Sequence, residues 1–174
     1  MVRLRHGIGG GAAMTVVKNC FLPEGLYYDV DRDVWARFEE DGQVTMGLTD
    51  VGQSRAGRIL TISFRRPVGT AIARGKVVVL LESGKWVGPV QSLFSGTITA
   101  LNERLLERPN LVNEAFYTDG WLVRLSPTDP GERALWPTGS EAVRRYTERI
   151  ALPYWSTRGV DEDFWCFHCR EASK

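Results

Sequence analysis

The chain has 174 residues, of which 43% are hydrophobic and 25% charged, values typical of one globular domain with extensions. Its formal net charge is only +1, which argues against nucleic acid or an anionic membrane as a partner, because so weak a field attracts neither. No apolar run approaches membrane-spanning length, so no membrane segment is predicted.

The N-terminal residues 1–19 are predicted to be a disordered or loosely ordered extension, because they are basic and then rich in glycine. Residues 7–12 match G-x-G-x-x-A. No strand precedes this match and no βαβ unit follows it, so it does not indicate a nucleotide-binding fingerprint.

Short β-forming runs separated by glycine turns fill residues 20–127, which we expect to form one domain. Asp41-Gly42 predicts a two-residue type I′ hairpin. Residues 49–56 predict a short helix that Thr49 caps and a left-handed Gly57 ends. This pattern is typical of an all-β sandwich or barrel. Further strands are predicted at 59–64, 77–81, 90–94, 97–101 and 121–125.

Residues 128–174 form a C-terminal extension. Thr138 and Glu141 have the spacing of a capping box. Val143, Tyr146 and Ile150 follow at helical spacing, which predicts an amphipathic helix packed on the β core. A tail with a Cys-x-x-Cys motif follows this helix.

The segment LLESGKWVGPV, residues 80–90, predicts a tight hairpin with Gly84 and Lys85 at its centre. A type II′ turn takes glycine at the first central position and an ordinary residue at the second, so Lys85 would stand at the outermost point. Most turn lysines are simply solvated. Here, however, Gly75 lies ten residues before Lys85 and Gly96 eleven after it, each at a turn that flanks the same two strands.

The frame around this lysine resembles a lipoyl domain, and its flanks narrow the resemblance to the H-proteins of the glycine cleavage system. VTMGLTDVGQSRAGRIL (44–60) and SGTITALNERLLERPNLVNEAFYTDGWLVRLSP (95–127) are similar to segments of that family. The resemblance covers about residues 24–127. It implies a mainly β fold, a flattened lipoyl-domain-like barrel or sandwich with short helices, here with a C-terminal helical extension. It also implies a cofactor site with covalent lipoate on Lys85 and with Glu82, Ser83, Gly84, Trp86, Gly75 and Gly96 around it.

Two residues beside the lysine depart from the family pattern. The family's motif is usually Glu-Ser-Val-Lys-Ala, whereas Gly84 and Trp86 flank Lys85 here. The family's His-Glu-Trp on an early strand is also replaced, by residues 33–35, Asp-Val-Trp. The run ESGKWVGP is similar to lipoate-binding proteins that work with heterodisulfide-reductase-like complexes in sulfur oxidation.

We therefore interpret the chain as a lipoate-carrying shuttle, not an enzyme, that transfers sulfur-containing intermediates between enzymes of such a system. Glycine cleavage, with transfer of an aminomethyl group, is the alternative. The chain has only two histidines, which agrees with a carrier, because histidine is the commonest proton-transfer group of enzymes. Expected partners are a lipoate-attaching enzyme and either a heterodisulfide-reductase-like complex or the glycine cleavage enzymes.

Each side chain beside Lys85 has two interpretations. Glu82 is either a recognition charge for the attaching enzyme or a solvated carboxylate at a strand end. Trp86 either stiffens the hairpin as an aromatic cross-strand partner or serves docking and shelter of the dithiolane. Biotin, the competing lysine cofactor, normally requires Met-Lys-Met, which is absent here.

Three cysteines give an odd count without a disulfide framework, which predicts a reducing, cytoplasmic compartment. Cys166 and Cys169 resemble a thioredoxin motif, but the chain that follows is too short for a βαβ unit. Zinc needs four ligands, so His168, Cys20, His6 or a second chain would have to complete a set, and no metal is expected. The rival interpretations are a reduced thiol pair, a dithiol that exchanges with lipoate, an autonomous redox or zinc protein, and an unmodified binding module.

Overall fold

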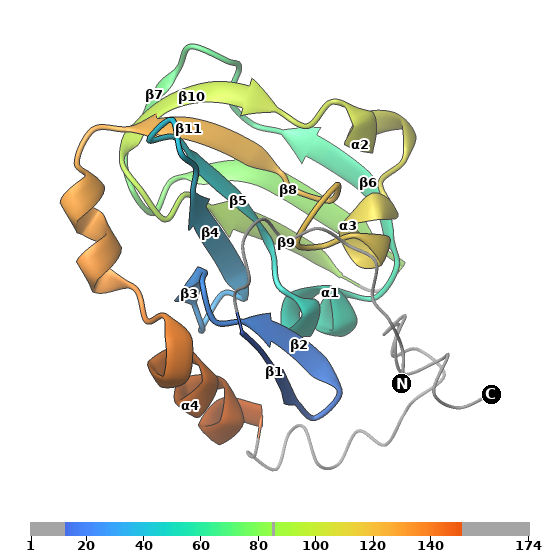
Figure 1. The fold of residues 1–174 in the computed structure, drawn as a ribbon. Helices are drawn as coiled ribbons and strands as arrows, with labels where there is room; N and C mark the ends of the chain where they lie inside the picture. The colour runs from blue at the N-terminus through green and yellow to red at the C-terminus, as the bar shows by residue number, and fades with distance from the viewer. Residues whose placement is uncertain (1–12, 85, 151–174) are drawn as a thin grey trace.

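The fold is a β-sandwich, described by a computed structural model for residues 13–84 and 86–150 (Figure 1). Its strands are β1 (Met14–Val17), β2 (Cys20–Pro23), β3 (Tyr27–Asp29), β4 (Val34–Phe38), β5 (Val44–Leu48), β6 (Ile59–Phe64), β7 (Ala71–Ile72), β8 (Val77–Ser83), β9 (Val87–Gln91), β10 (Gly96–Leu101) and β11 (Val123–Pro127). A six-stranded sheet of order β3-β4-β5-β11-β10-β7 faces a three-stranded sheet of order β6-β8-β9, and β1 pairs with β2. The predicted mainly β class is confirmed, as an open sandwich rather than a closed barrel.

Short helices cover the ends of the sandwich. The helix predicted after Thr49 is confirmed: the Thr49 hydroxyl accepts a hydrogen bond from the Gly52 N–H, 3.1 Å away. Gly57 ends this helix with φ +78° and ψ −168°, a region open to glycine but outside the predicted left-handed helical one. The helices are α1 (Asp50–Ala56), α2 (Arg104–Glu107), α3 (Leu111–Glu114), the 3₁₀ helix η1 (Pro130–Leu135) and α4 (Gly139–Ile150).

The main hydrophobic core lies between the two sheets. Val79 and Leu81 of β8 and Val90 of β9 are buried on one side, and Met46 and Leu125 are buried on the other. Burial of such side chains is the main favourable term in folding. The strands that carry the hairpin are therefore held by the interior of the protein.

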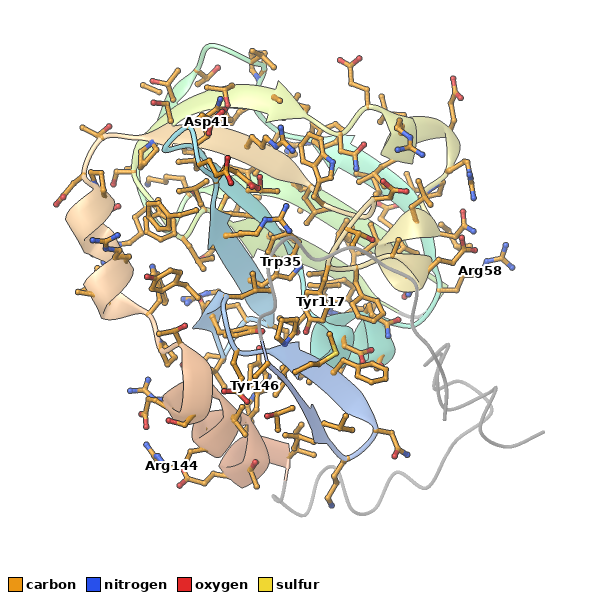
Figure 2. The ribbon with its side chains drawn as sticks, viewed as in Figure 1. Trp35, Asp41, Arg58, Tyr117, Arg144 and Tyr146 are labelled. Atoms are coloured by element: carbon orange, nitrogen blue, oxygen red, sulfur yellow. The ribbon has the colours of Figure 1, made fainter. Side chains whose placement is uncertain are left out.

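A second buried cluster joins the β core to α4, and Trp35 lies at its centre. The Trp35 Nε1–H donates to the carbonyls of Leu48 at 3.0 Å and Phe116 at 2.9 Å. Figure 2 shows Trp35, Tyr117 and Tyr146 in the interior of this region. Burial raises the pKa of the Tyr117 and Tyr146 hydroxyls well above the usual value, so both stay neutral.

The amphipathic helix predicted after residue 138 is confirmed as α4, and it packs on the β core as expected. Asp33, only 3% exposed, accepts hydrogen bonds from Arg55 Nη1 at 2.7 Å and from Arg149 of α4. The predicted capping box is wrong. The Thr138 hydroxyl instead donates to the Leu26 carbonyl at 2.7 Å, and Glu141 accepts hydrogen bonds from two arginines of the same helix.

One predicted turn and two predicted strands also differ from the structure. The loop at Asp41-Gly42 has three residues rather than two, because the Glu39 N–H bonds the Gln43 carbonyl, and only Gly42 there has positive φ. This corresponds to a three-residue hairpin with glycine at its last position. The strand expected at 90–94 is β9, which begins earlier, at Val87, where it pairs with Glu82, and ends at Gln91. Likewise, the strand expected at 121–125 is β11, two residues later.

The N-terminal extension is shorter than predicted. Met14–Val17 forms β1, which pairs with β2 across a turn at Lys18 and Asn19, both with positive φ. Asparagine tolerates this conformation better than most residues, which lets so tight a turn form. Residues 1–12 lie outside the described part of the chain. Within the described ranges, no helix is long and apolar enough to cross a membrane.

We expect Trp35→Phe to lower the free energy of unfolding by about 1–3 kcal/mol, because two buried carbonyls lose their donor. The measurement is chemical denaturation of the purified protein. Trp136→Phe is the matched control, because Trp136 is only half-buried and donates to one carbonyl, that of Leu93. An equal loss for both variants would contradict a central role for Trp35.

Candidate functional site: the β8–β9 hairpin

The tip of the hairpin has the predicted two residues between its closing pair. Glu82 pairs with Val87 in the β8–β9 register, and the Ser83 N–H donates to the Trp86 carbonyl at 2.8 Å. Gly84 and Lys85 therefore form the whole connection. Lys85 itself lies outside the described residues, so its immediate neighbours define the site.

Gly84 does not have the conformation that the type II′ prediction requires. It is not among the glycines with positive φ, and that turn needs positive φ at its first central residue. A Cβ at this position would meet nothing within 4 Å. The prediction was wrong because a Gly-X pair also fits two-residue turns with ordinary φ values.

Trp86 folds back onto its own strand. A Cβ built on Gly88 would lie 1.6 Å from Trp86 Cζ2 and 2.0 Å from Cη2, so the indole occupies the space of a side chain at position 88. Along β9, Gly88 is buried and Val87 is exposed. The ring thus lies on the inward side of the strand, and 38% of the residue stays exposed.

Glu82 is exposed at the end of β8, on the face opposite to the core. Its carboxylate makes no ion pair with any of the described residues. Its neighbour across the hairpin, Val87, is 61% exposed. A partner protein can therefore reach this carboxylate, which is compatible with both interpretations of Glu82.

The base of the hairpin is fixed at the two glycines predicted to frame it. Gly75 has φ +81°, and its N–H donates to the Ser92 carbonyl at 2.8 Å. Gly96 lies between two neighbouring strands, where an added Cβ would lie 2.2 Å from the Ser126 carbonyl oxygen. Both positions thus need glycine, one for its conformation and one for its lack of a side chain.

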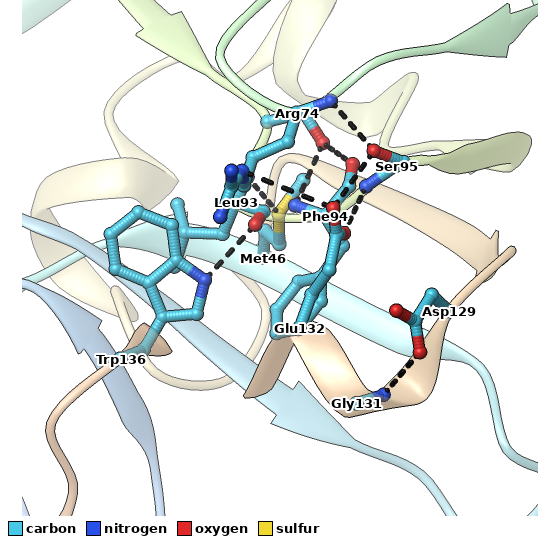
Figure 3. Close-up of polar contacts among 10 residues, drawn as sticks. Met46, Arg74, Leu93, Phe94, Ser95, Asp129, Gly131, Glu132 and Trp136 are labelled. Carbon is cyan, nitrogen blue, oxygen red and sulfur yellow. Dashed lines mark hydrogen bonds and ion pairs between the residues drawn. The ribbon is translucent and has the colours of Figure 1, made fainter. Parts of the chain in front are cut away.

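A carboxylate from η1 locks the loops at this base (Figure 3). Glu132 accepts hydrogen bonds from the Ser95 N–H at 2.7 Å and from the Ser95 hydroxyl at 3.0 Å. The Ser95 hydroxyl oxygen in turn accepts the Arg74 N–H at 3.1 Å. Glu132 was not expected from the sequence, because it is 37 residues from its partner and follows no local pattern.

The strand beside the tip is held by Asn113, which the sequence did not single out either. Its side chain is fully buried. Asn113 Oδ1 accepts the Ile59 N–H at 2.8 Å, and Nδ2 donates to the Gly57 carbonyl at 2.9 Å. Because Ile59 pairs with Ser83, these bonds support the hairpin directly behind its tip.

The predicted site residues therefore fall into two groups. Glu82, Ser83, Gly84 and Trp86 surround Lys85 at the tip, whereas the two framing glycines lie at the other end of β8. A strand of seven residues spans roughly 20–25 Å, so the glycines shape the hairpin and do not reach its tip.

The cysteines that the sequence singles out are described only in part. Cys166 and Cys169 lie outside the described residues. Cys20 is 4% exposed in the second buried cluster. Within residues 13–84 and 86–150, no group of three or more His, Cys, Asp or Glu side chains could hold a metal ion.

Known proteins resemble this chain in sequence and in fold. Residues 26–148 match the family model described as Glycine cleavage H-protein. The chain is 51% identical to glycine cleavage system H protein 3 of Aquifex aeolicus (strain VF5) over 111 residues, 64% of this chain and 68% of that protein. It is 44% identical to H protein 2 of the same organism over 135 residues, 76% and 83% of the two chains. The chain therefore belongs to the glycine cleavage H-protein family.

A solved structure from the same family also matches the fold. A crystal structure of a glycine cleavage system H protein from Mycobacterium marinum matches with a TM-score of 0.63 and 26% identity, over 71% of this chain and 98% of that one. Members of the family carry lipoate covalently on a lysine and are carriers rather than catalysts. These relatives support the glycine-cleavage alternative better than the sulfur-oxidation interpretation, which they do not test.

We expect three glycine-to-alanine variants of the hairpin to separate clearly in stability. Gly84→Ala changes the free energy of unfolding by less than about 0.5 kcal/mol, because its surroundings are open. Gly75→Ala lowers it by about 1–2 kcal/mol through its positive φ, and Gly96→Ala by about 1–3 kcal/mol through overlap with backbone. Denaturant titration measures all three, and a large loss for Gly84→Ala would refute the open tip.

Proposed function

We propose that Lys85 is the lipoyl attachment residue and that the chain shuttles a group between enzymes without catalysing a reaction itself. The observation that carries this proposal is the two-residue tip, which leaves only Gly84 and Lys85 beyond the Ser83–Trp86 hydrogen bond. A lysine at such a tip is accessible to an attaching enzyme. A lipoyl group bound to the lysine can extend into the active site of another protein.

The residues present fit a covalent lipoyl group. Gly84 has no neighbour within 4 Å of its Cβ position, so nothing described obstructs approach from that side. Glu82 and Val87 are exposed behind the tip, which leaves a surface that an attaching enzyme can hold. Amide formation removes the charge of a lysine, and the Glu82 carboxylate behind the tip makes no ion pair with any described residue.

The chain's own residues position the attachment point and supply little else. When bound, lipoate supplies a cyclic disulfide that becomes a dithiol with two electrons and two protons, and a thiolate is the reactive form. No histidine occurs among the described residues. On this proposal the partner enzymes supply the acid–base chemistry, and the hairpin presents the arm to them.

Glycine cleavage is the reaction system that the family supports best. On this proposal the chain carries an aminomethyl group between glycine cleavage enzymes, and a lipoate-attaching enzyme loads it. The odd number of cysteines, without a disulfide framework, favours the reducing cytoplasm as the compartment.

Sulfur carriage is a second candidate, favoured by the two residues that flank Lys85. Gly84 is not required by the turn, and Trp86 lies on Gly88, so neither departure from the family motif is explained by the fold alone. One organism also has H proteins numbered 2, 3 and 5. Several copies in one cell favour a division of tasks, and on this proposal a heterodisulfide-reductase-like complex is the partner.

Lipoylation of Lys85 is tested by intact mass after incubation with a lipoate-attaching enzyme, lipoate and ATP. We expect one lipoyl increment on the wild type and none on Lys85→Arg. Lys76→Arg is the matched control, because Lys76 is an exposed lysine at the base of the same hairpin, and it should be modified like the wild type. An increment that persists in Lys85→Arg would refute the attachment residue.

The two reaction systems are separated by offering the lipoylated protein to each. Glycine cleavage predicts glycine-dependent loading with the decarboxylase of that system. Sulfur carriage predicts loading from a reduced sulfur compound with the heterodisulfide-reductase-like complex. Mass spectrometry of the loaded arm identifies the transferred group, and loading by the second system alone would overturn glycine cleavage.

The pair Cys166→Ser and Cys169→Ser in the same assay tests whether the tail thiols exchange with the arm.

A further inference from the structure

We propose that Trp86, held in place by Gly88, is a resting surface for the dithiolane ring of the arm on Lys85. This inference rests on the proposed attachment of lipoate. It adds a binding site for a cyclic disulfide on the carrier's own hairpin, formed by an indole and by the glycine under it.

Gly88 leaves the space that the indole of Trp86 occupies. The six-membered ring of Trp86 stands where a side chain at position 88 would begin, with Cζ2, Cη2 and Cε2 at 1.6, 2.0 and 2.3 Å from the Cβ position. An L side chain cannot share that space, so the present orientation of Trp86 requires glycine there. Gly88 is itself buried, although it is only three residues from Lys85 along the chain.

The position of the indole does not match that of a core residue. Val90 and Leu81, further along the same inward face, are 2% and 0% exposed, whereas Trp86 keeps 38% of its surface in solvent. The cross-strand partner at the tip is Ser83, which is not aromatic. The contact observed is with a glycine of the same strand, so an aromatic cross-strand pair does not explain the residue.

The exposed part of the ring suits a small apolar disulfide. Sulfur makes favourable contacts with aromatic rings, and an apolar group gains by leaving water. Trp86 is the chain neighbour of Lys85, and the arm is long and rotates freely enough to fold back on it. The contact is weak by nature, on the order of a 2- to 10-fold shift in population, so a partner enzyme can still withdraw the arm.

A resting contact has a consequence that does not depend on any partner enzyme. Thiol–disulfide exchange needs in-line access of a thiolate to a sulfur. A dithiolane that spends most of its time on Trp86 is less accessible to small thiols than one in free solution. The hairpin would thus protect the oxidised arm from adventitious reduction while leaving it available to a docked partner.

The test follows reduction of the lipoylated protein by dithiothreitol, which becomes a cyclic disulfide as the dithiolane becomes a dithiol. Intact mass first confirms one lipoyl group in every variant. We expect reduction to be about 2- to 10-fold faster in Trp86→Ala and in Gly88→Ala than in the wild type. Val87→Ala is the matched control, because Val87 lies next to Trp86 but faces outward, and its rate should equal that of the wild type.

A second measurement reports on the indole itself. Tryptophan emission should fall when the wild type is lipoylated, because a disulfide in contact with an indole quenches it, and Gly88→Ala should weaken this fall while retaining Trp86. In a Trp86→Ala background, Gly88→Ala should make no further difference to the reduction rate. Gly88 acts only by leaving room for the indole, and that variant has no indole.

The outcomes distinguish this inference from the proposed attachment of lipoate to Lys85, on which it rests. Absence of the lipoyl increment on Lys85 would overturn both. A lipoylated protein whose reduction rate and emission are the same in the wild type, Trp86→Ala and Gly88→Ala would overturn the resting surface alone. In that case, slower turnover of Trp86→Ala with a partner enzyme would assign the indole to docking instead.

Discussion

The pairing of β8 with β9 is the constraint on which the rest of the structure depends. Backbone hydrogen bonds hold the two strands from the Gly75–Ser92 contact at one end to the Ser83–Trp86 contact at the other. A slip of one residue would move the whole buried set to the outer face. The position of Lys85 at the tip is therefore a consequence of core packing between the sheets.

Rigidity is concentrated behind the tip rather than at it. Glu132 fixes the loops at the base of the hairpin, and Asn113 fixes the strand beside its end. Both use buried or half-buried hydrogen bonds, whose loss would leave polar groups unsatisfied. The tip itself presents an exposed carboxylate, a glycine in open space and a partly exposed indole. This arrangement suits the proposed carrier function, in which the scaffold fixes the position of Lys85 and partner enzymes supply the chemistry.

Much of the fold was accessible from local pattern, and the errors share a physical cause. The α1 helix and the hairpin at Lys85 were predicted because capping chemistry and strand alternation act within a few residues. The turn at Gly84, the loop at Asp41 and the cap at Thr138 were predicted wrongly, because each short pattern fits more than one geometry. At Thr138 a distant group chose the geometry, because the Leu26 carbonyl accepts the Thr138 hydroxyl.

The sequence by itself determined the β8–β9 hairpin and the family. The hairpin follows from the short spacing around Lys85, and the family from the segments at 44–60 and 95–127 that flank it. Only the tertiary structure decided what supports and surrounds that lysine. The bond from Glu132 to Ser95 depends on how η1 packs against the loops. The contact of Trp86 with Gly88 depends on which face of β9 turns toward the core. Both follow from packing and register, which arise when distant strands meet and which no short stretch of sequence contains.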